Sequence, residues 1–382
     1  MILQRRRSRW WIPVLIGMLI GVGVYAGLSL RSPGFPLAME PTPTPAPTAT
    51  PPQARPHLEE AARLEAEGRM GEAVVEYRQA IAVEPKQPES YLRLARILVY
   101  RREPAEGATL VQKALELSPQ SAEAYSVLAV ANDWNEDPDQ AIASARRAIE
   151  INPNLAEAHA FLAEAYGDKQ RLDDAATELE KAVALDPNSV AVTRVKGYLH
   201  ELHGRYPEAA KEYGRAVELA PKQPYLYILL GNVLKATNNL DGAILQYQRA
   251  ATLDPKDPRA AAAMGACYYS QESYARAEEQ LKAALTMDPN YALPLGQLAL
   301  VYYAQKRNAE AIPYFLRAIE MEKSPQKLAS YHHAAGWSLY AEKRYPEARE
   351  QFTRALQLDP KLQGAKDGLE MVKKAEQESK RP

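Results

Sequence analysis

The sequence predicts an all-α fold: a solenoid of about nine helix-turn-helix repeats, preceded by one transmembrane helix and a Pro/Thr-rich linker. Three observations predict it. Prolines recur every 34 residues from Pro85 to Pro289, alanines follow the same spacing, and the uncharged run 10–30 follows a cluster of arginines. The chain carries 47 Lys plus Arg against 48 Asp plus Glu, which gives no reason to expect nucleic acid as a partner.

Residues 1–30 have the pattern of a membrane signal-anchor. Residues 1–9 form a basic segment with Arg5, Arg6, Arg7 and Arg9, and residues 10–30 carry no charge. A helix of 21 residues, rising 1.5 Å per residue, crosses a hydrocarbon core of about 30 Å. Because basic residues stay on the cytoplasmic side, we expect a single-pass protein of the cell membrane, with a cytoplasmic N-terminus and an extracytoplasmic repeat domain.

Two alternatives remain open for this segment. The first is a secretory signal peptide that is cleaved after Ala26. The second concerns the spacings Gly17–Gly21 and Gly23–Gly27, which would pair two membrane helices and give a homodimer. Glycine is also common in membrane helices that do not pair, so the spacing is compatible with a monomer.

Residues 31–56 form a disordered spacer rich in proline and threonine. Nine prolines lie between Ser32 and Pro56. Proline has no backbone N–H to donate, and it biases the preceding residue toward extended geometry. We therefore expect a polyproline-II-like chain that holds the following domain away from the membrane.

Residues 57–362 contain three columns of small residues at the repeat spacing. Antiparallel helices approach closely where side chains are small, and larger apolar residues fill the spaces between them. The first column is Ala61, Ala95, Ala129, Ala163, Gly197, Gly231, Gly265, Ala299 and Gly336. The second is Ala73, Gly107, Ala141, Ala175, Ala209, Ala243, Ala277, Ala311 and Ala348. The third is Ala80, Ala114, Ala148, Ala182, Ala216, Ala250, Ala284, Ala318 and Ala355.

The sixth repeat shows how one unit is built. Its first helix carries Tyr227, Leu230, Gly231 and Leu234 at helical spacing. The segment Asn238-Asn239 with Gly242 predicts the turn to the second helix, and Asp254-Pro255 predicts the turn out of it. This pattern resembles the tetratricopeptide repeat, whose period is 34 residues. The resemblance implies a right-handed superhelix in which the first helix of each repeat lines a concave groove.

The end of the repeat array departs from the regular spacing. Lys323 occupies a proline slot, and the phase shifts by three residues before Pro360. We expect the extra residues near Ser324–Gln326, as a longer turn between repeats. Residues 363–382 are expected to form a solvating cap helix and tail, because one apolar stripe (Leu362, Ala365, Leu369 and Val372) lies on an otherwise charged segment.

No catalytic motif is present, so we predict that the protein is not an enzyme and needs no cofactor. His200 and His203 share a helix face, but no third metal ligand is evident. His200 occupies a slot filled elsewhere by Leu98 and Tyr166, which indicates packing, and no metal site is predicted. His332 lies in the slot of Tyr227 and receives the same interpretation.

Given the geometry that the resemblance implies, the position of a residue within its repeat predicts whether it faces the concave groove. Aromatic rings on the first helices would supply contact area to a protein or peptide partner, and polar residues on the same face would add hydrogen bonds. The predicted partner-binding residues are Tyr100, Trp134, Tyr198, Tyr225, Asn232, Lys235, Tyr269, Tyr303, Trp337 and Tyr340. Arg96, Arg194 and Arg259 lie on the same face. The alternative is that these rings pack against neighbouring repeats.

The leading functional hypothesis is a membrane-anchored scaffold that binds protein or peptide partners in the groove and supports assembly at the cell envelope. One alternative is a carbohydrate-binding or cell-wall-binding surface protein, because Tyr and Trp rings also stack on sugars. Another is a non-catalytic accessory subunit of an envelope enzyme. The sequence does not identify the partner.

Overall fold

The computed structural model describes residues 53–379, which belong to one compact unit. Regular structure in this part of the chain is entirely helical. The predicted basic segment 1–9, the anchor 10–30 and all but the last four residues of the spacer 31–56 lie outside the described residues. Among the helices of residues 53–379, none combines the length and the apolar character that crossing a membrane requires.

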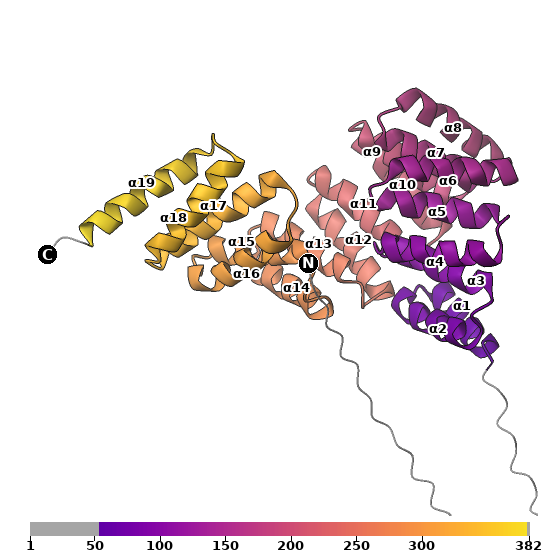
Figure 1. Ribbon diagram of the computed structural model, residues 1–382, viewed down its shortest axis with the longest axis horizontal. Helices are drawn as coiled ribbons and strands as arrows, with labels where there is room; N and C mark the ends of the chain where they lie inside the picture. Colours follow the sequence, from indigo (N-terminus) through magenta and orange to yellow (C-terminus); the bar gives the residue numbers. More distant parts are fainter. Residues whose placement is uncertain (1–52, 380–382) are drawn as a thin grey trace, which may run out of the picture. The chain divides into compact units, whose positions relative to one another are not determined.

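Nine consecutive helix pairs and one further helix make up residues 55–378, which confirms the predicted all-α solenoid (Figure 1). The first helices of the pairs are α1 (Arg55–Glu67), α3 (Pro88–Tyr100), α5 (Ala122–Trp134), α7 (Ala156–Asp168), α9 (Val190–Leu202), α11 (Pro224–Ala236), α13 (Pro258–Ser270), α15 (Ala292–Ala304) and α17 (Pro325–Ala341). The second helices are α2 (Met70–Val83), α4 (Pro104–Leu117), α6 (Pro138–Ile151), α8 (Leu172–Leu185), α10 (Tyr206–Leu219), α12 (Leu240–Leu253), α14 (Tyr274–Met287), α16 (Asn308–Met321) and α18 (Tyr345–Leu358). The last helix is α19 (Gln363–Glu378).

The turn inside each pair uses one recurring backbone conformation. A left-handed residue with φ between 56° and 85° occurs in every pair, at Gly68, Arg102, Glu136, Gln170, Gly204, Asn238, Glu272, Lys306 and Lys343. Asn238 and Asn239 therefore lie in the predicted turn. Gly242 does not. It lies in the first turn of α12, where its N–H donates to the Asn239 side chain (3.0 Å) because Asn239 caps that helix.

The small columns lie at the centre of the helix pairs. The alanines of all three columns are at most 2% exposed. The glycines of the columns fill places where a larger residue from the other helix of the pair needs the space. A Cβ on Gly231 would stand 2.5 Å from the Tyr247 ring, and one on Gly336 would stand 2.6 Å from the Phe352 ring. These columns therefore set how closely the two helices of a pair approach.

The three-residue insertion lengthens a helix, so the predicted longer turn near Ser324–Gln326 is wrong. The first helix α17 has 17 residues where α15 has 13. The connection before α17 is one residue shorter than the one before α15, and Pro325 begins the helix. The chain absorbs the extra residues in this way because proline fits the first turn of a helix. The terminal helix α19 buries Ala365 and Val372 against Phe352, as the apolar stripe predicts.

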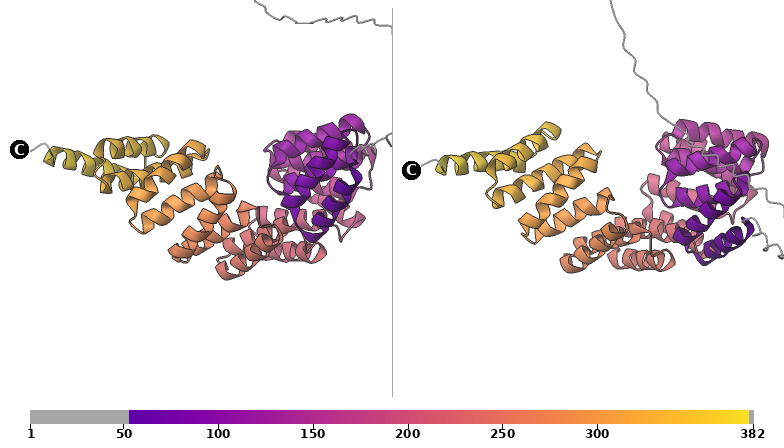
Figure 2. Two further views of the ribbon diagram at one scale, coloured as in Figure 1. Left: turned by 90° about the horizontal axis from the view of Figure 1, so that it is seen from below. Right: turned by 60° about the horizontal axis from the view of Figure 1, so that its bottom comes forward.

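The pairs stack in chain order, but the first half of the array curves back on itself. Figures 1 and 2 show α1–α3 beside α11–α12, whereas α15–α19 extend away from this region. The contacts among α5, α7 and α9 are more extensive than those among α13, α15 and α17. Close packing of consecutive first helices bends a solenoid toward them. We call the region from α1 to α13 the closed turn.

Candidate functional site

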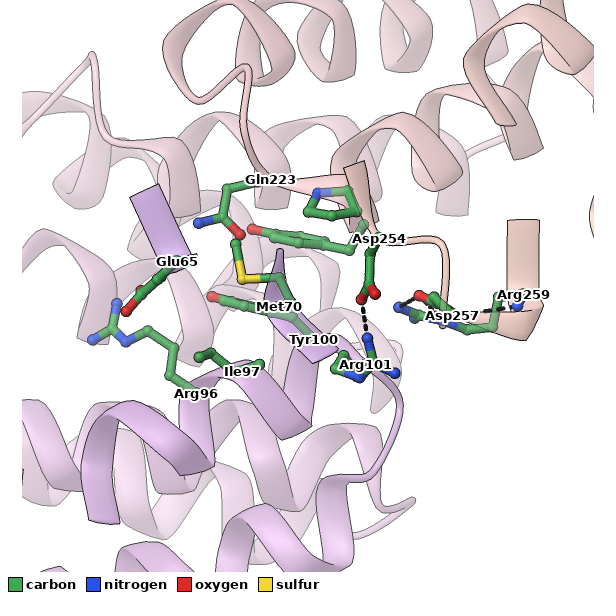
Figure 3. Close-up of a pocket in the computed structure, with 12 residues that line it drawn as sticks. Glu65, Met70, Arg96, Ile97, Tyr100, Arg101, Gln223, Asp254, Asp257 and Arg259 are labelled. Carbon is green, nitrogen blue, oxygen red and sulfur yellow. Dashed lines mark hydrogen bonds and ion pairs between the residues drawn. The ribbon is translucent and has the colours of Figure 1, made fainter. Parts of the chain in front are cut away.

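A seam between α1–α3 and α11–α13 completes the closed turn (Figure 3). Tyr100 stacks on Tyr225, with ring centroids 4.2 Å apart and planes inclined by 7°. Arg101 forms an ion pair with the buried Asp254, which lies 153 residues further along the chain. A Cβ on Gly68 would stand 2.7 Å from the carbonyl oxygen of Lys222. The cavity that remains at the seam measures about 40 Å³, which leaves room for little more than water.

Three of the predicted partner-binding rings meet at this seam. Tyr225 is 5% exposed, and Tyr100 and Trp134 are half-buried. The Trp134 ring meets Tyr100 edge-on at 5.6 Å, and its Nε1 donates to Glu164 at 3.0 Å. These rings hold the closed turn together, so a partner would reach Tyr225 only after the seam opened.

The other predicted residues of the closed turn line its interior. Tyr198, Asn232 and Lys235 are half-buried and border two neighbouring cavities. The Tyr198 hydroxyl donates to Asp168, and Asn232 accepts from the Tyr247 hydroxyl at 2.9 Å.

The first of these cavities is basic and aromatic. It has a volume of about 200 Å³ and is lined by the cations Arg102, Lys235 and Arg259. No carboxylate lines it, although Arg259 is held by a bidentate contact with Asp257 outside it. Arg102 lies 4.5 Å from the centre of the Trp134 ring, in cation–π geometry. Burial, together with the nearby charge of Arg259, lowers the pKa of Arg102.

The second cavity, of about 340 Å³, is acidic, and we call it the acidic cavity. It is lined by five carboxyl groups and two guanidinium groups, with the rings of Trp134, Tyr198 and Tyr213. The charged residues are Asp133, Glu136, Glu164, Asp168, Glu201, Arg102 and Arg194. Acidic groups thus outnumber basic ones around this space.

Most charged groups of the acidic cavity have partners within the chain. Arg194 and Glu164, each 2% exposed, form a bidentate ion pair in which Nη1 donates to Oε1 at 2.7 Å. Burial opposes the charge of Arg194, but the Glu164 carboxylate outweighs it and raises the pKa of the guanidinium group. Glu201 accepts from the Tyr213 hydroxyl at 3.0 Å. A second ion pair, Arg96 with Glu157 at 2.9 Å, links α3 to α7.

Asp133 is different from its neighbours. Its residue is 5% exposed, and neither carboxyl oxygen has a hydrogen-bond partner among the described residues. Burial and the nearby charges of Glu164 and Asp168 raise the pKa of Asp133 to about 9, although Arg194 acts in the opposite direction. Asp133 is therefore a protonated carboxylic acid at neutral pH.

The predicted rings on α13, α15 and α17 differ from the core tyrosines in their hydrogen bonding. Tyr269, Tyr303, Trp337 and Tyr340 are half-buried and lie on α13, α15 and α17. The hydroxyls of the core residues Tyr77, Tyr213 and Tyr247 all donate to side chains of the same repeat. In contrast, the hydroxyls of Tyr269, Tyr303 and Tyr340 make no hydrogen bond to any other described residue. The Trp337 Nε1 donates to His333 at 2.9 Å.

The histidines take part in packing contacts. His332 Nδ1 lies 2.7 Å from the Gln351 Oε1, and His203 Nδ1 lies 2.6 Å from the Leu199 carbonyl oxygen. His200 is half-buried, and burial lowers its pKa. Within residues 53–379 no three His, Cys, Asp or Glu side chains are grouped as a metal site requires.

Sequence analysis did not single out the acidic residues of the closed turn. The repeat spacing carried the necessary signal, because Asp133 and Glu201 occupy the same column as Lys235, Tyr269 and Tyr303. A search of that column for all polar residues, and not only for aromatic ones, would have found Asp133. Asp168 and Arg194 lie in other columns of the first helices, and each has a partner 30 residues away in an adjacent repeat: Tyr198 in the next repeat for Asp168, and Glu164 in the preceding repeat for Arg194.

Two solved structures share the fold of this chain. The crystal structure of the APC/C hetero-tetramer Cut9-Hcn1 aligns with a TM-score of 0.56 and 18% identity, over 74% of this chain and 55% of that chain. This chain thus spans about half the length of that relative. The human IFIT1 dimer with PPP-AAAA aligns with a TM-score of 0.53 and 19% identity, over 71% of this chain and 73% of that chain.

Sequence comparison gives the family. No curated protein matches the chain. Four family profiles described as tetratricopeptide repeat match residues 92–156, 162–224, 202–267, 258–291 and 291–361. These matches cover most of the helix pairs and agree with the 34-residue spacing and with the shared fold. The protein belongs to the tetratricopeptide repeat family.

Proposed function

We propose that the protein is a scaffold that binds protein partners on the first helices of its C-terminal repeats, and that residues 10–30 anchor it in the cell membrane. The tetratricopeptide repeat is a fold of protein-interaction scaffolds, which supports the class of function. The anchoring is supported by the uncharged run 10–30 behind its basic segment. Together these features would place a binding surface at the cell envelope.

One observation carries the binding surface. Tyr269, Tyr303 and Tyr340 keep partly exposed rings whose hydroxyls have no partner among the described residues. Tyrosine and tryptophan are favoured at protein interfaces because they combine a large apolar surface with a polar group and lose little entropy on binding. The rings recur on consecutive first helices, so an extended peptide or a helix laid across α13–α17 would meet them in series.

A capture experiment tests this surface. The full chain in detergent is compared with a variant in which Tyr269, Tyr303, Trp337 and Tyr340 are all changed to alanine. A matched control changes Tyr206 and Tyr314 to alanine, because these half-buried rings lie on second helices. Proteins of the native membrane extract that bind the wild type and the control, but not the fourfold variant, are the expected partners.

Loss of a partner can be attributed to the four changed side chains only if the variant is folded. Circular dichroism of each variant therefore checks that its helices are intact. Equal recovery on all three baits would contradict the proposal, because the rings would then only pack within the chain.

The membrane anchor is tested separately. The full chain should resist extraction from membranes by alkaline carbonate, and a chain lacking residues 1–52 should not. Release of both chains would show that residues 10–30 do not hold the protein in a membrane.

A further inference from the structure

The acidic cavity of the closed turn has the chemistry of a binding site distinct from the C-terminal rings. Four helical carboxyl groups line it, and three of them have partners: Glu164 with Arg194, Asp168 with Tyr198, and Glu201 with Tyr213. Asp133, at the wall of the same cavity, has none among the described residues. A buried polar group without a partner is costly, so an unpartnered carboxyl group at the wall of a charged cavity is a feature that a binding site would explain.

We propose that the acidic cavity binds an alkylammonium group, carried by a lysine side chain of a partner or by a free polyamine. The charge favours a cation, because four carboxylates besides the protonated Asp133 surround two guanidinium groups, and Arg194 is already neutralised by Glu164. The ring of Tyr198 provides apolar surface for the carbon chain and can attract a cation electrostatically, whereas the Trp134 ring already faces Arg102 and Arg194. The volume of about 340 Å³ lies within the range of small-ligand pockets.

An organic cation fits this site better than a metal ion. The carboxyl groups that line the cavity are not grouped as metal ligands, and the described residues contain no such group elsewhere. A metal ion needs several oxygen atoms at about 2.0–2.6 Å around one point. An ammonium group tolerates a looser arrangement, because its three N–H donors can reach separate acceptors.

Binding of the cation is coupled to the protonation of Asp133. Glu164 and Asp168 on α7 face this carboxyl group and favour its protonated form, and Arg194 on α9 favours the ionised form. A cation in the cavity adds to the effect of Arg194, so the Asp133 pKa falls and its proton is released. Binding should therefore tighten as the pH rises from 7 toward 9.

Isothermal titration calorimetry of the full chain in detergent tests the proposal at pH 8. The probes are putrescine, Nα-acetyl-lysine methylamide and Mg²⁺. The wild type should bind an ammonium probe, and Asp133→Asn should bind it about tenfold more weakly, because an amide cannot release a proton and become negatively charged when the cation binds. The control Asp173→Asn, an exposed carboxylate on α8, should bind like the wild type. Binding of putrescine alone would indicate a free polyamine, and binding of the lysine derivative would indicate a polypeptide.

Protons released on binding are taken up by the buffer, so the measured enthalpy depends on the ionisation enthalpy of the buffer. The binding enthalpy should therefore differ between Tris and phosphate for the wild type and agree for Asp133→Asn. The proposal would be overturned by the absence of binding of both ammonium probes at millimolar concentration, by equal affinity of Asp133→Asn, or by Mg²⁺ binding as tightly as the ammonium probes. These results leave the capture experiment unaffected, because the cavity does not include Tyr269, Tyr303, Trp337 or Tyr340.

Discussion

Asp133 and Arg194 are two buried ionisable side chains of one cavity, and they differ in whether they are charged. Arg194 keeps its charge because Glu164 meets it in a bidentate contact. Asp133 has no donor among the described residues, and burial together with two carboxylates on α7 raises its pKa, so it keeps its proton instead. A buried charge is tolerated where it is paired and is neutralised where it is not.

This difference predicts how stability depends on pH. The Asp133 pKa is about 9 in the folded chain and near the ordinary value of 3.8 in the unfolded chain. Between these values the folded state binds the extra proton, so the contribution of Asp133 is fully favourable below pH 4 and is lost as the pH rises toward 9. Asp133→Asn removes this pH-dependent loss of stability, because an amide does not ionise. We expect it to unfold at a higher temperature than the wild type at pH 8, with a gain of several kcal/mol, because each pH unit between the two pKa values costs the wild type about 1.4 kcal/mol.

Thermal melts between pH 4 and pH 9 measure the effect. The gain of Asp133→Asn over the wild type should shrink as the pH falls, because the wild-type carboxyl group is then protonated in both states. Asp173→Asn serves as the exposed control. A gain that stayed constant with pH would mean that the Asp133 carboxyl group titrates alike in the folded and unfolded chains.

At the scale of the element, the turn inside each helix pair places one residue in the left-handed region, whatever its side chain. Only two of these nine residues are glycine, at positions 68 and 204. Other residues adopt this conformation at a cost of about 1–2 kcal/mol, which the packing of the two helices overcomes. Gly204 is a clean case, because a Cβ there would meet no atom within 4 Å.

Two substitutions of opposite sign follow from this geometry. Gly204→Ala should lower the free energy of unfolding by about 1 kcal/mol through backbone strain alone. Lys306→Gly should raise it by a similar or smaller amount, because Lys306 has φ of 60° and its side chain is exposed. Chemical denaturation of each variant gives the values. A stabilising Gly204→Ala would show that the entropy of the unfolded chain outweighs the turn strain.

The helix pairs could be predicted because each repeat states the same pattern again. The columns headed by Ala61, Ala73 and Ala80 place the helix interfaces, and the prolines at 34-residue spacing mark the connections. Two local predictions are wrong. Residue type predicts a turn at Gly242 and the shift in repeat phase predicts one near Ser324–Gln326, yet Gly242 lies in the helix that Asn239 caps, and Pro325 begins a helix that Ser324 precedes.

The site was less predictable because it depends on contacts between distant repeats. Repeat phase identified Tyr100 and Tyr225 as residues of the inner face. That these two rings stack on each other across the seam follows from the curvature of the whole array, which one repeat does not encode. The protonation of Asp133 likewise depends on side chains of the next two repeats, Glu164, Asp168 and Arg194.

At the scale of the whole molecule, the spacing of the first helices differs between the two halves of the array. In the closed turn, Gly167 allows α9 to approach α7 so closely that a Cβ would stand 2.7 Å from the Leu199 side chain. The contacts among α5, α7 and α9 are more extensive than those among α13, α15 and α17, where the position of Gly167 is occupied by Tyr269 and Tyr303. Gly167 therefore contributes to the curvature of the closed turn.

Two features bring α1–α3 close to α11–α13: the curvature of the array and the contacts at the seam. Their contributions can be separated by measuring the distance across the seam. Spin labels at Gln79 on α2 and Gln248 on α12, both exposed, report the distance across the seam in a Cys267→Ala background. Combining Arg101→Ala with Tyr225→Ala removes the ion pair and the stack, so the distance distribution should broaden around a similar mean. Gly167→Ala places a Cβ 2.7 Å from the end of the Leu199 side chain, and we expect α9 to shift with that side chain, so that the mean distance itself lengthens. The exposed pair Lys169–Asp139 provides the control, Lys169→Ala, which should leave the distribution unchanged. A lengthened mean in the seam variant, with no change in Gly167→Ala, would assign closure to the Arg101 and Tyr225 contacts and would refute the role of Gly167.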